Sequence, residues 1–197
     1  RRNISRKRQE EFALNSHNKA IEAKSNEYFR EEVASIIIPG TNQEIGHDLD
    51  GCMRQSSLES MARLKPAFID NGVVTAATSS PLTDGSSFSL VASQRAVNEY
   101  KLTPMARIVS AAVVGVNPDE MGLGPIPSTL LALKRAGLSV EDLDVIELNE
   151  AFSSQSLACI DELNLPIEKI NIDGGAIALG HPLGASGARI VGKTASL

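Results

Sequence analysis

From residue 106 to its end, the chain repeats one pattern in which a short apolar run precedes a stretch of helical periodicity. The pattern predicts strands over residues 106–116, 142–152 and 170–180, and helices over residues 125–137, 153–163 and 185–197. Strands that alternate with helices favour an α/β fold whose sheet is mixed but mostly parallel. Ligands bind such a sheet beyond the carboxyl ends of its strands, so functional residues are expected where these strands end.

The first hundred residues are less regular. Ser5 is a suitable N-cap for a helix that runs to Ala20. The basic run from Arg1 to Arg8 is interpreted as the start of this helix rather than as a nucleic-acid patch, since acidic and apolar residues follow at once. Beyond it the sequence predicts, in chain order, a helical stretch over 22–29, a strand over 32–39, a loop over 40–57, a short helix from 57 that ends before Pro66, two strands around a polar turn within 71–93, and a helix over 94–102.

Composition excludes several classes of protein. With a net charge of −5, a nucleic-acid partner is not expected. No apolar run approaches the roughly 18 residues of a membrane span, and no signal peptide is recognisable, so secretion is not expected. The two cysteines, Cys52 and Cys159, form no CxxC pair and indicate a reduced compartment. The chain begins with Arg1 and ends at Leu197 within an apolar-periodic stretch, from which we expect both ends to be cut.

The motif "GGAIALGHPLGASGARI" (residues 174–190) contains His181, one of three histidines in the chain. Gly180 permits a tight turn before it, and Pro182 stiffens the chain after it. The next helix begins with small residues, so its N-terminus can accept an anion or a developing negative charge. His181 is therefore a candidate general base or oxyanion donor; the alternative is a histidine with a structural role.

Two further motifs lie at or near strand ends. In "ELNEAF" (residues 147–152), the amide of Asn149 either fixes a water or a carbonyl group, or closes a turn. The segment "TAATSSPLTDG" (residues 75–85) is a polar turn whose small residues would let a ligand lie close to the backbone. An ordinary β-turn is the alternative for that segment.

Taken together, five segments resemble the thiolase family: "GGAIALGHPLGASGAR", "ELNEAF", "MGLGPIPST", "LTDGSS" and "SRKRQEEFALNSHNKA". They occur in the family's order and at family-like spacing, and the resemblance covers essentially the whole chain. It implies part of a layered α-β-α-β-α thiolase fold. It also implies an acyltransferase that cleaves or forms 3-ketoacyl-CoA by ping-pong acyl transfer, with CoA and acyl-CoA as substrates and with no bound cofactor or metal.

The resemblance also implies roles for individual residues. His181 matches the histidine that takes the proton from a nucleophilic cysteine and helps to form an oxyanion hole. Asn149 matches the asparagine that holds the water completing that hole. Residues that match pocket-lining or CoA-contacting positions are Ala151, Phe152, Met121, Ser80, Leu82, Ala76, Phe68, Ser60 and Arg54.

The chain departs from the family pattern in its cysteines. The family's nucleophilic cysteine lies in a C-x-S-G-like context upstream of anything present here, and its second catalytic cysteine lies in a C-x-G-x-G motif beyond residue 197. Cys52 follows a glycine-containing loop and Cys159 lies within a helix, where it is expected to be packed. Neither is assigned as the nucleophile.

Measured against the family, residues 1–75 are expected to form part of a CoA-covering loop domain. Residues 76–103 would be the last strand and helix of the N-terminal half, and residues 104–197 an incomplete C-terminal half. A homodimer or homotetramer of the full-length enzyme is expected, in the cytoplasm of a bacterium or otherwise in a peroxisome or mitochondrion.

Three readings of the function compete. "SHNKA", "TSSPLTDG" and "LACIDEL" favour the degradative 3-ketoacyl-CoA thiolase of fatty-acid β-oxidation over an acetoacetyl-CoA-forming acetyl-CoA acetyltransferase. The second reading is a truncated, non-catalytic protein that binds CoA or a thiolase subunit. The third is a plain α/β domain in which the motifs occur by chance.

Overall fold

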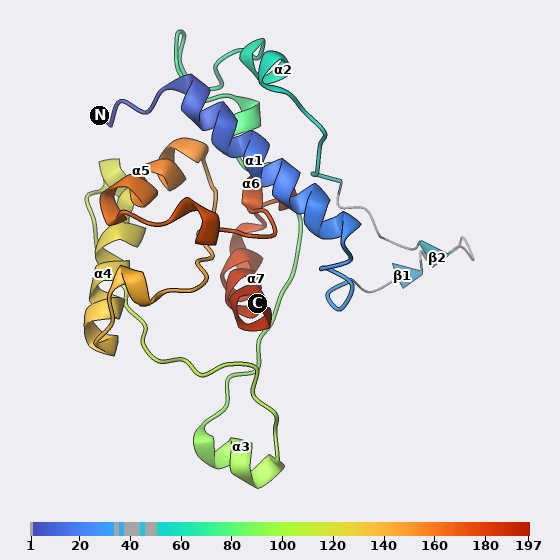
Figure 1. Ribbon diagram of the computed structural model, residues 1–197, viewed down its shortest axis with the longest axis vertical. Coiled ribbons are helices and arrows are strands. Elements are labelled where there is room, and N and C mark those ends of the chain that lie inside the picture. Colours follow the sequence, from blue (N-terminus) through green and yellow to red (C-terminus); the bar gives the residue numbers. More distant parts are fainter. Residues whose placement is uncertain (1, 34–35, 38–43, 46–50) are drawn as a thin grey trace.

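The longest helix, α1 (Arg6–Ser25), lies across the other elements of the core in the computed structural model, which describes residues 2–33, 36–37, 44–45 and 51–197. It contacts α2 (Leu58–Ala62), α5 (Ser153–Leu163) and the short helix α6 (Ala176–Leu179). The helix α7 (Leu183–Ser196) lies on the other side of α6 from α1 (Figure 1). The hydrophobic core fills the space between these helices. Its buried side chains are Phe12, Ala13, Met61, Leu157, Ile160, Leu163, Leu165, Ile170 and Ile177.

The start of α1 follows the sequence prediction. The hydroxyl of Ser5 accepts a hydrogen bond from the backbone N–H of Arg8 and caps the helix. The guanidinium of Arg8 also donates two hydrogen bonds, of 2.7 and 2.5 Å, to the carboxylate of Asp161 on α5. The interpretation of the basic run as the start of a helix is confirmed for Arg6, Lys7 and Arg8, whereas Arg2 precedes the helix and Arg1 lies outside the described residues. The helix ends at Ser25, and because Glu27 has a left-handed φ of 60°, the predicted helical stretch over 22–29 is wrong beyond this point.

Four other helices lie where the sequence predicts them. They are α3 (Gln94–Tyr100), α4 (Pro125–Ala136), α5 and α7, and α2 also ends before Pro66 as expected. Helix α4 ends at Gly137, whose φ of 70° is the left-handed conformation that glycine adopts without steric cost. Capping residues and apolar periodicity, which are local features of the sequence, were sufficient to predict these helices.

Strands are much rarer than the sequence predicts. Within the described residues, the only sheet is the antiparallel pair β1 (Ile36–Ile37) and β2 (Glu44–Ile45). The rest of the strand predicted over 32–39 and of the loop over 40–57 lies largely outside the described residues. Residues 76–78 form a 3₁₀ turn within the segment interpreted as a polar turn. Residues 176–179 form α6, so the prediction of a strand over 170–180 is wrong at those positions.

The predicted strands over 142–152 and 170–180 meet at a single parallel bridge, between Ile146 and Ile170. After this bridge the backbone of Asn171 leaves the extended conformation, with a φ of 44°. The side chain of Asn171, instead of its backbone, then pairs with the segment that contains Leu148. Its Oδ1 accepts from the N–H of Leu148 and its Nδ2 donates to the carbonyl of Leu148, both at 2.8 Å. A side-chain amide thus replaces the next residue of a strand.

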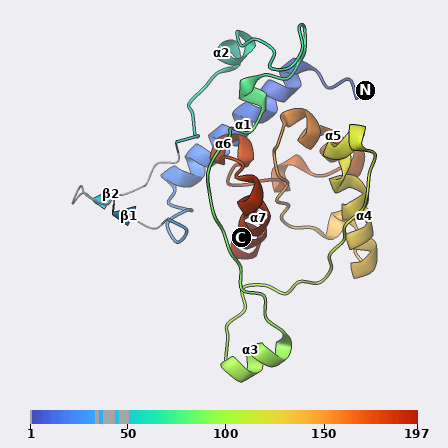
Figure 2. The same ribbon diagram turned by 180° about the vertical axis from the view of Figure 1, so that it is seen from behind.

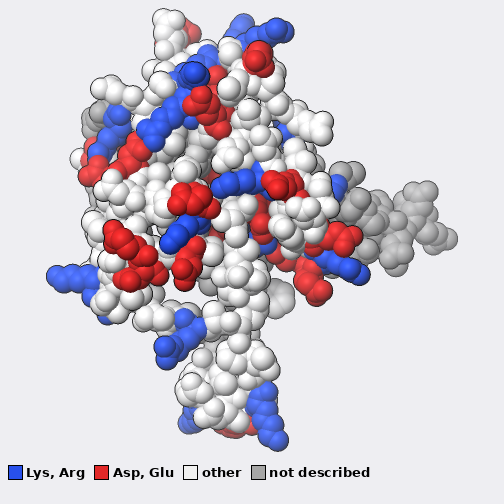
Figure 3. All heavy atoms as spheres, viewed as in Figure 1, with Lys and Arg blue, Asp and Glu red and all other residues white. Residues whose placement is uncertain are grey.

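Two extended segments, residues 86–93 and 104–116, lead to and from α3, which lies at the tip of an arm away from the other helices (Figures 1 and 2). Phe88 is 97% exposed and Val113 is 95% exposed. Their apolar pattern predicts strands, but no described segment pairs with their backbones. A strand requires a partner for its N–H and C=O groups, so periodicity alone does not form one. Figure 3 shows charges of both signs mixed over the visible face of the remainder of the molecule.

We predict that Ile170→Ala lowers the free energy of unfolding by about 2–5 kcal/mol, because Ile170 is 2% exposed within the core. The same change at Ile108, which is 65% exposed, should cost less than about 1 kcal/mol. Urea unfolding followed by circular dichroism measures both. Equal losses for the two variants would contradict this description of the core.

Candidate active site

The two residues assigned catalytic roles lie in contact. The Nδ2 of Asn149 is 3.3 Å from the Nε2 of His181, although 32 positions separate the two residues in sequence. Asn149 follows the segment that pairs with Ile170, and His181 follows α6 directly. The chain therefore brings the ends of two predicted strands together, as the α/β pattern leads one to expect.

The other ring nitrogen of His181 contacts Ser186, one of the small residues in the first turns of α7. Its Nδ1 lies 2.6 Å from the hydroxyl oxygen of Ser186, and that hydroxyl donates to the carbonyl of Pro182 at 3.2 Å. The serine has one hydrogen. With that hydrogen on Pro182, the hydroxyl oxygen accepts from Nδ1–H, and an unprotonated Nε2 faces the amide of Asn149.

In that arrangement the lone pair that a general base requires lies on Nε2, beside the amide of Asn149. The amide oxygen of Asn149 is buried and has no hydrogen-bond partner in the part of the chain that the structure describes. Its capacity to accept a hydrogen bond is therefore unused within those residues. Together the two side chains offer a proton acceptor and a polar anchor at one point.

The polar turn at residues 75–85 packs against the histidine turn. Gly180 has a φ of 96°, and a Cβ there would lie 2.7 Å from Cγ2 of Thr83. A Cβ at Gly85 would lie 2.7 Å from Cγ of Pro182. Glycine is thus required at both positions by close approach of the two segments.

The same turn is tied to the asparagine segment. The N–H of Ser80 donates to the carbonyl of Ala151 at 3.0 Å, and the Ser80 hydroxyl donates to it at 3.2 Å. The ring of Phe68 packs edge to face on that of Phe152, with centroids 5.9 Å apart. Three motifs that are separate in sequence therefore meet in one place.

A cavity of about 270 Å³ opens between α1, α2 and the polar turn at residues 75–85. It is lined by Arg54, Ser60 and Ala76 from the expected CoA contacts, and also by His17, Cys52, Ser56, Met61, Leu64, Ala77, Ser79, Pro81 and Ile177. The other expected contacts do not line it. Of these, Leu82 is fully exposed, and Phe68 and Met121 are largely exposed, at 69% and 76%.

His17 was not expected to contribute, because nothing reactive is near it in sequence. It is 6% exposed, and its Nδ1 accepts from the backbone N–H of Arg54 at 3.3 Å. Burial, and then the charge of Arg54, lower the pKa of His17, so the cavity wall holds a neutral imidazole. The burial of His17 could have been predicted from its helical spacing to Phe12, Ala13 and Ala20, since all four residues share the buried face of α1.

The cysteines are placed differently from each other. Cys159 is fully buried, as predicted, and its thiol donates to the carbonyl of Gly122 at 3.5 Å. Burial raises the pKa of the Cys159 thiol, which makes it a poor nucleophile. Cys52 is half-buried in the wall of the cavity. The hydrogen-bond partners of His181 are Asn149 and Ser186.

Among the residues that the structure describes, no three or more His, Cys, Asp or Glu side chains gather in a group that could hold a metal ion. Over the same ranges, no helix combines the length and the apolar character needed to cross a membrane.

Both halves of the chain are similar to known protein families. Residues 1–95 match the family described as "Thiolase, N-terminal domain", and residues 102–197 match "Thiolase, C-terminal domain". A 3-ketoacyl-CoA thiolase of Yersinia enterocolitica is 49% identical over 202 residues, which cover 95% of this chain and 50% of that protein. The chain thus spans about half the length of the curated relatives it matches.

Solved structures similar to this chain come from the same kinds of enzyme. An acetyl-CoA acetyltransferase of Bacillus anthracis superimposes with a TM-score of 0.91 at 42% identity, covering 98% of this chain and 49% of that one. Human mitochondrial 3-ketoacyl-CoA thiolase in complex with CoA gives a TM-score of 0.87 at 40% identity, covering 98% and 48%. The expected partial thiolase fold is confirmed, even though most of its strands lack partners within the described residues.

We predict that Ser186→Ala releases the tautomer of His181, because Nδ1–H loses its acceptor. In ¹⁵N NMR the unaltered chain should show a protonated Nδ1 and an unprotonated Nε2, and the variant a mixture of tautomers. Ser25→Ala, whose hydroxyl donates to Ile21 on α1, is the matched control and should leave the His181 signals unchanged. A protonated Nε2 in the unaltered chain at neutral pH would refute the assignment.

A pH effect is expected from Glu147, two residues before Asn149. Burial raises the pKa of this carboxyl from 4.5 to about 7, and the carboxylates of Glu150 and Asp173 add to the rise. The positive charges of Arg189 and Lys193 oppose it. Between about pH 4.5 and 7 the unfolded chain ionises this group while the folded chain keeps the proton. The free energy of unfolding therefore falls as pH rises through this window.

The fall attributable to Glu147 should be roughly 3 kcal/mol, at 1.36 kcal/mol per pKa unit. Glu147→Gln should remove it, and Glu168→Gln, at an exposed position, should retain it. Urea midpoints measured from pH 4 to 8 test this. An unchanged pH slope in Glu147→Gln would show that another group causes the fall.

Proposed function

The chain belongs to the thiolase family, and on that premise we propose that it provides the histidine and asparagine of a thiolase active site. The reaction proposed is thiolytic cleavage of 3-ketoacyl-CoA to acetyl-CoA and a shortened acyl-CoA in fatty-acid β-oxidation. The observation that carries the proposal is the 3.3 Å contact between Nε2 of His181 and the side-chain amide of Asn149. The name of the Yersinia relative, 3-ketoacyl-CoA thiolase, supports the reaction class.

In this proposal His181 accepts the proton of a nucleophilic cysteine that lies outside residues 1–197. The thiolate attacks the 3-keto carbon, the bond between carbons 2 and 3 breaks, and an acyl-cysteine thioester forms. The departing acetyl-CoA leaves as an enolate, whose oxygen needs hydrogen-bond donors aimed at it. The enolate gains at carbon 2 the equivalent of the proton that the cysteine lost, and the thiol of a CoA molecule then attacks the acyl-cysteine to release the shortened acyl-CoA and the free cysteine. Protonated His181 and a water held by Asn149 supply those donors.

The cavity beside α1 is the proposed site for part of CoA. Arg54 brings a positive charge suited to the phosphates of the nucleotide, and Ser60 brings a hydroxyl. Ser80 and Ala76 extend the site toward Asn149, since Ser80 is bonded to Ala151. Ala151, Phe152, Phe68, Leu82 and Met121 remain proposed contacts of the acyl or pantetheine chain.

Formation of acetoacetyl-CoA is the second candidate, because the acetyl-CoA acetyltransferase of Bacillus anthracis superimposes as well as the ketoacyl thiolase does. A non-catalytic protein that binds CoA or a thiolase subunit is the third. It is favoured by the hydrogen-bond partners of His181, which include no cysteine. Assembly as a dimer or tetramer, and a location in the bacterial cytoplasm, a peroxisome or a mitochondrion, are part of the main proposal.

The test is steady-state thiolysis by the native protein that contains residues 1–197, with its intact mass measured. His181→Ala should lower kcat by about 10²–10⁴-fold, and Asn149→Ala by about 10²–10³-fold. Asn98→Ala, at an exposed position on α3, is the matched control. Faster cleavage of a longer 3-ketoacyl-CoA than of acetoacetyl-CoA would support the degradative assignment.

Two outcomes would contradict parts of this proposal. Turnover by the 197-residue chain alone would refute the assignment of an outside nucleophile. Calorimetric binding of CoA by a native protein of 20.9 kDa that shows no thiolysis would favour the non-catalytic reading.

A further inference from the structure

Glu150 carries a buried carboxyl group that the proposed mechanism does not use. Burial raises the pKa of this carboxyl, and hydrogen bonds from Ser16, Asn171 and Ile177 oppose the rise. Glu150 is 2% exposed and lies next to Asn149 in the chain. Its Oε2 accepts hydrogen bonds from the hydroxyl of Ser16 at 2.6 Å and from the N–H of Ile177 at 3.1 Å. Its Oε1 accepts from Nδ2 of Asn171 at 2.8 Å. A buried carboxylate requires such donors, and here all three come from different segments.

The hydroxyl of Ser16 extends this network to a fourth group. It donates to Glu150 and accepts from the N–H of Gly175 at 3.0 Å. Ser16 is on α1, whereas Gly175 and Ile177 begin the turn that leads through α6 to His181. Glu150 thus joins the long helix to the segment that carries the histidine.

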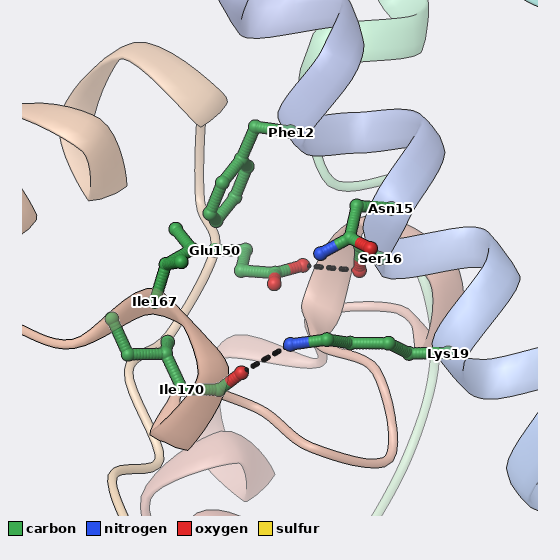
Figure 4. A pocket seen from close by; sticks show the side chains of 7 residues that line it. All are labelled: Phe12, Asn15, Ser16, Lys19, Glu150, Ile167 and Ile170. Atoms are coloured by element: carbon green, nitrogen blue, oxygen red, sulfur yellow. Dashed lines mark hydrogen bonds between the residues drawn. The ribbon is translucent and has the colours of Figure 1, made fainter.

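A bound ligand does not account for this carboxylate. The pocket beside Glu150, shown in Figure 4, has a volume of about 10 Å³ and is lined by Phe12, Asn15, Ser16, Lys19, Ile167 and Ile170. That is room for one water at most. The groups that Glu150 contacts are therefore groups of the protein itself.

The backbone is shaped to admit the carboxylate. A Cβ at Gly175 would overlap the carboxyl group of Glu150. At Gly174, which has a φ of 86°, a Cβ would lie 2.6 Å from Cβ of Ala20 and 2.8 Å from the carbonyl oxygen of Ser16. The two glycines let the turn lie directly on α1 with the carboxylate between them.

The network reaches both halves of the proposed site. Ile177 gives its N–H to Glu150, and it also lines the cavity proposed for CoA. His17, next to Ser16 on α1, lines the same cavity. On the other side, Glu150 adjoins Asn149, and α6 connects Ile177 to His181 over four residues. One side chain therefore restrains the asparagine, the histidine and the cavity wall together.

We propose that Glu150 is a positioning residue that, through Ser16, Asn171 and Ile177, sets the distance between Asn149 and His181. This inference rests on the proposed function for its catalytic consequence, but its geometric content does not depend on turnover.

Glu150→Gln is a sharp test because an amide cannot satisfy the network in either orientation. With its NH₂ toward Asn171, two donors face each other, and Asn171 cannot turn because Leu148 holds both ends of its amide. With its NH₂ at the other position, it faces the N–H of Ile177. The variant keeps the size of the side chain, but it replaces one acceptor oxygen with a donor NH₂ group and removes the acidic group.

In ¹⁵N NMR of the whole chain, Glu150→Gln should shift the ring nitrogens of His181 and the side-chain amide of Asn149. Glu168→Gln, which makes the same chemical change at an exposed site, should shift neither. In the native protein, Glu150→Gln should lower kcat about 100-fold, the scale of a 1 Å misplacement, and change KM less than threefold. Ser16→Ala, which removes one bond of the network, should do the same more weakly, by about tenfold in kcat, with Ser25→Ala as its control.

Unchanged His181 and Asn149 signals in Glu150→Gln would overturn the proposal, even if the variant were less stable. A kcat lowered no more than in Glu168→Gln would also overturn it. If Glu150→Gln does not fold, Ser16→Ala decides the question by the same two measurements. If the unaltered protein shows no thiolysis, the proposed function fails, and the NMR comparison still decides whether Glu150 positions the pair.

Discussion

The carboxylate of Glu150 lies between α1 and the turn at residues 174–181, and the geometry of the site depends on how it is satisfied. A buried charge without donors would be costly, so the donors around it must stay in place. Ser16, Asn171 and Ile177 supply these donors from three segments that lie far apart in the chain. The hydrogen bonds to Glu150 therefore fix how the three segments are placed relative to one another. Asn149 and His181 extend directly from those segments, and their 3.3 Å contact follows from that placement.

Around this carboxylate, each part of the site uses a different physical device. Glycine at position 180 allows close packing against Thr83, and the hydroxyl of Ser186 holds Nδ1 of the imidazole by a hydrogen bond. The backbone of Ser80 and Ala151 joins the polar turn to the asparagine segment. Chemistry that needs a lone pair on one nitrogen of His181 therefore rests on hydrogen bonds made by residues that do not react themselves.

Several strands predicted from the sequence have no ladder within the described residues, although the helices between them form as predicted. A helix satisfies its own backbone and needs only its caps and one apolar face, as α4 and α5 illustrate. A strand needs the backbone of another segment, which residues 104–116 do not meet. Agreement with complete thiolases, at TM-scores of 0.87 to 0.91, shows that the path of the chain is nevertheless that of the family.

The sequence by itself determined the longer helices, the family and the two candidate catalytic residues, because capping, periodicity and contiguous motifs are local properties. His181 and Asn149 were recognisable from the glycines, the proline and the strand ends beside them. The roles of Glu150, Ser186 and His17 were decided only by the tertiary structure. Each depends on a partner brought close by folding: Ser16 for Glu150, the imidazole for Ser186, and Arg54 for His17. Spacing along a chain carries no record of such contacts, since hydrogen bonds and burial act across space.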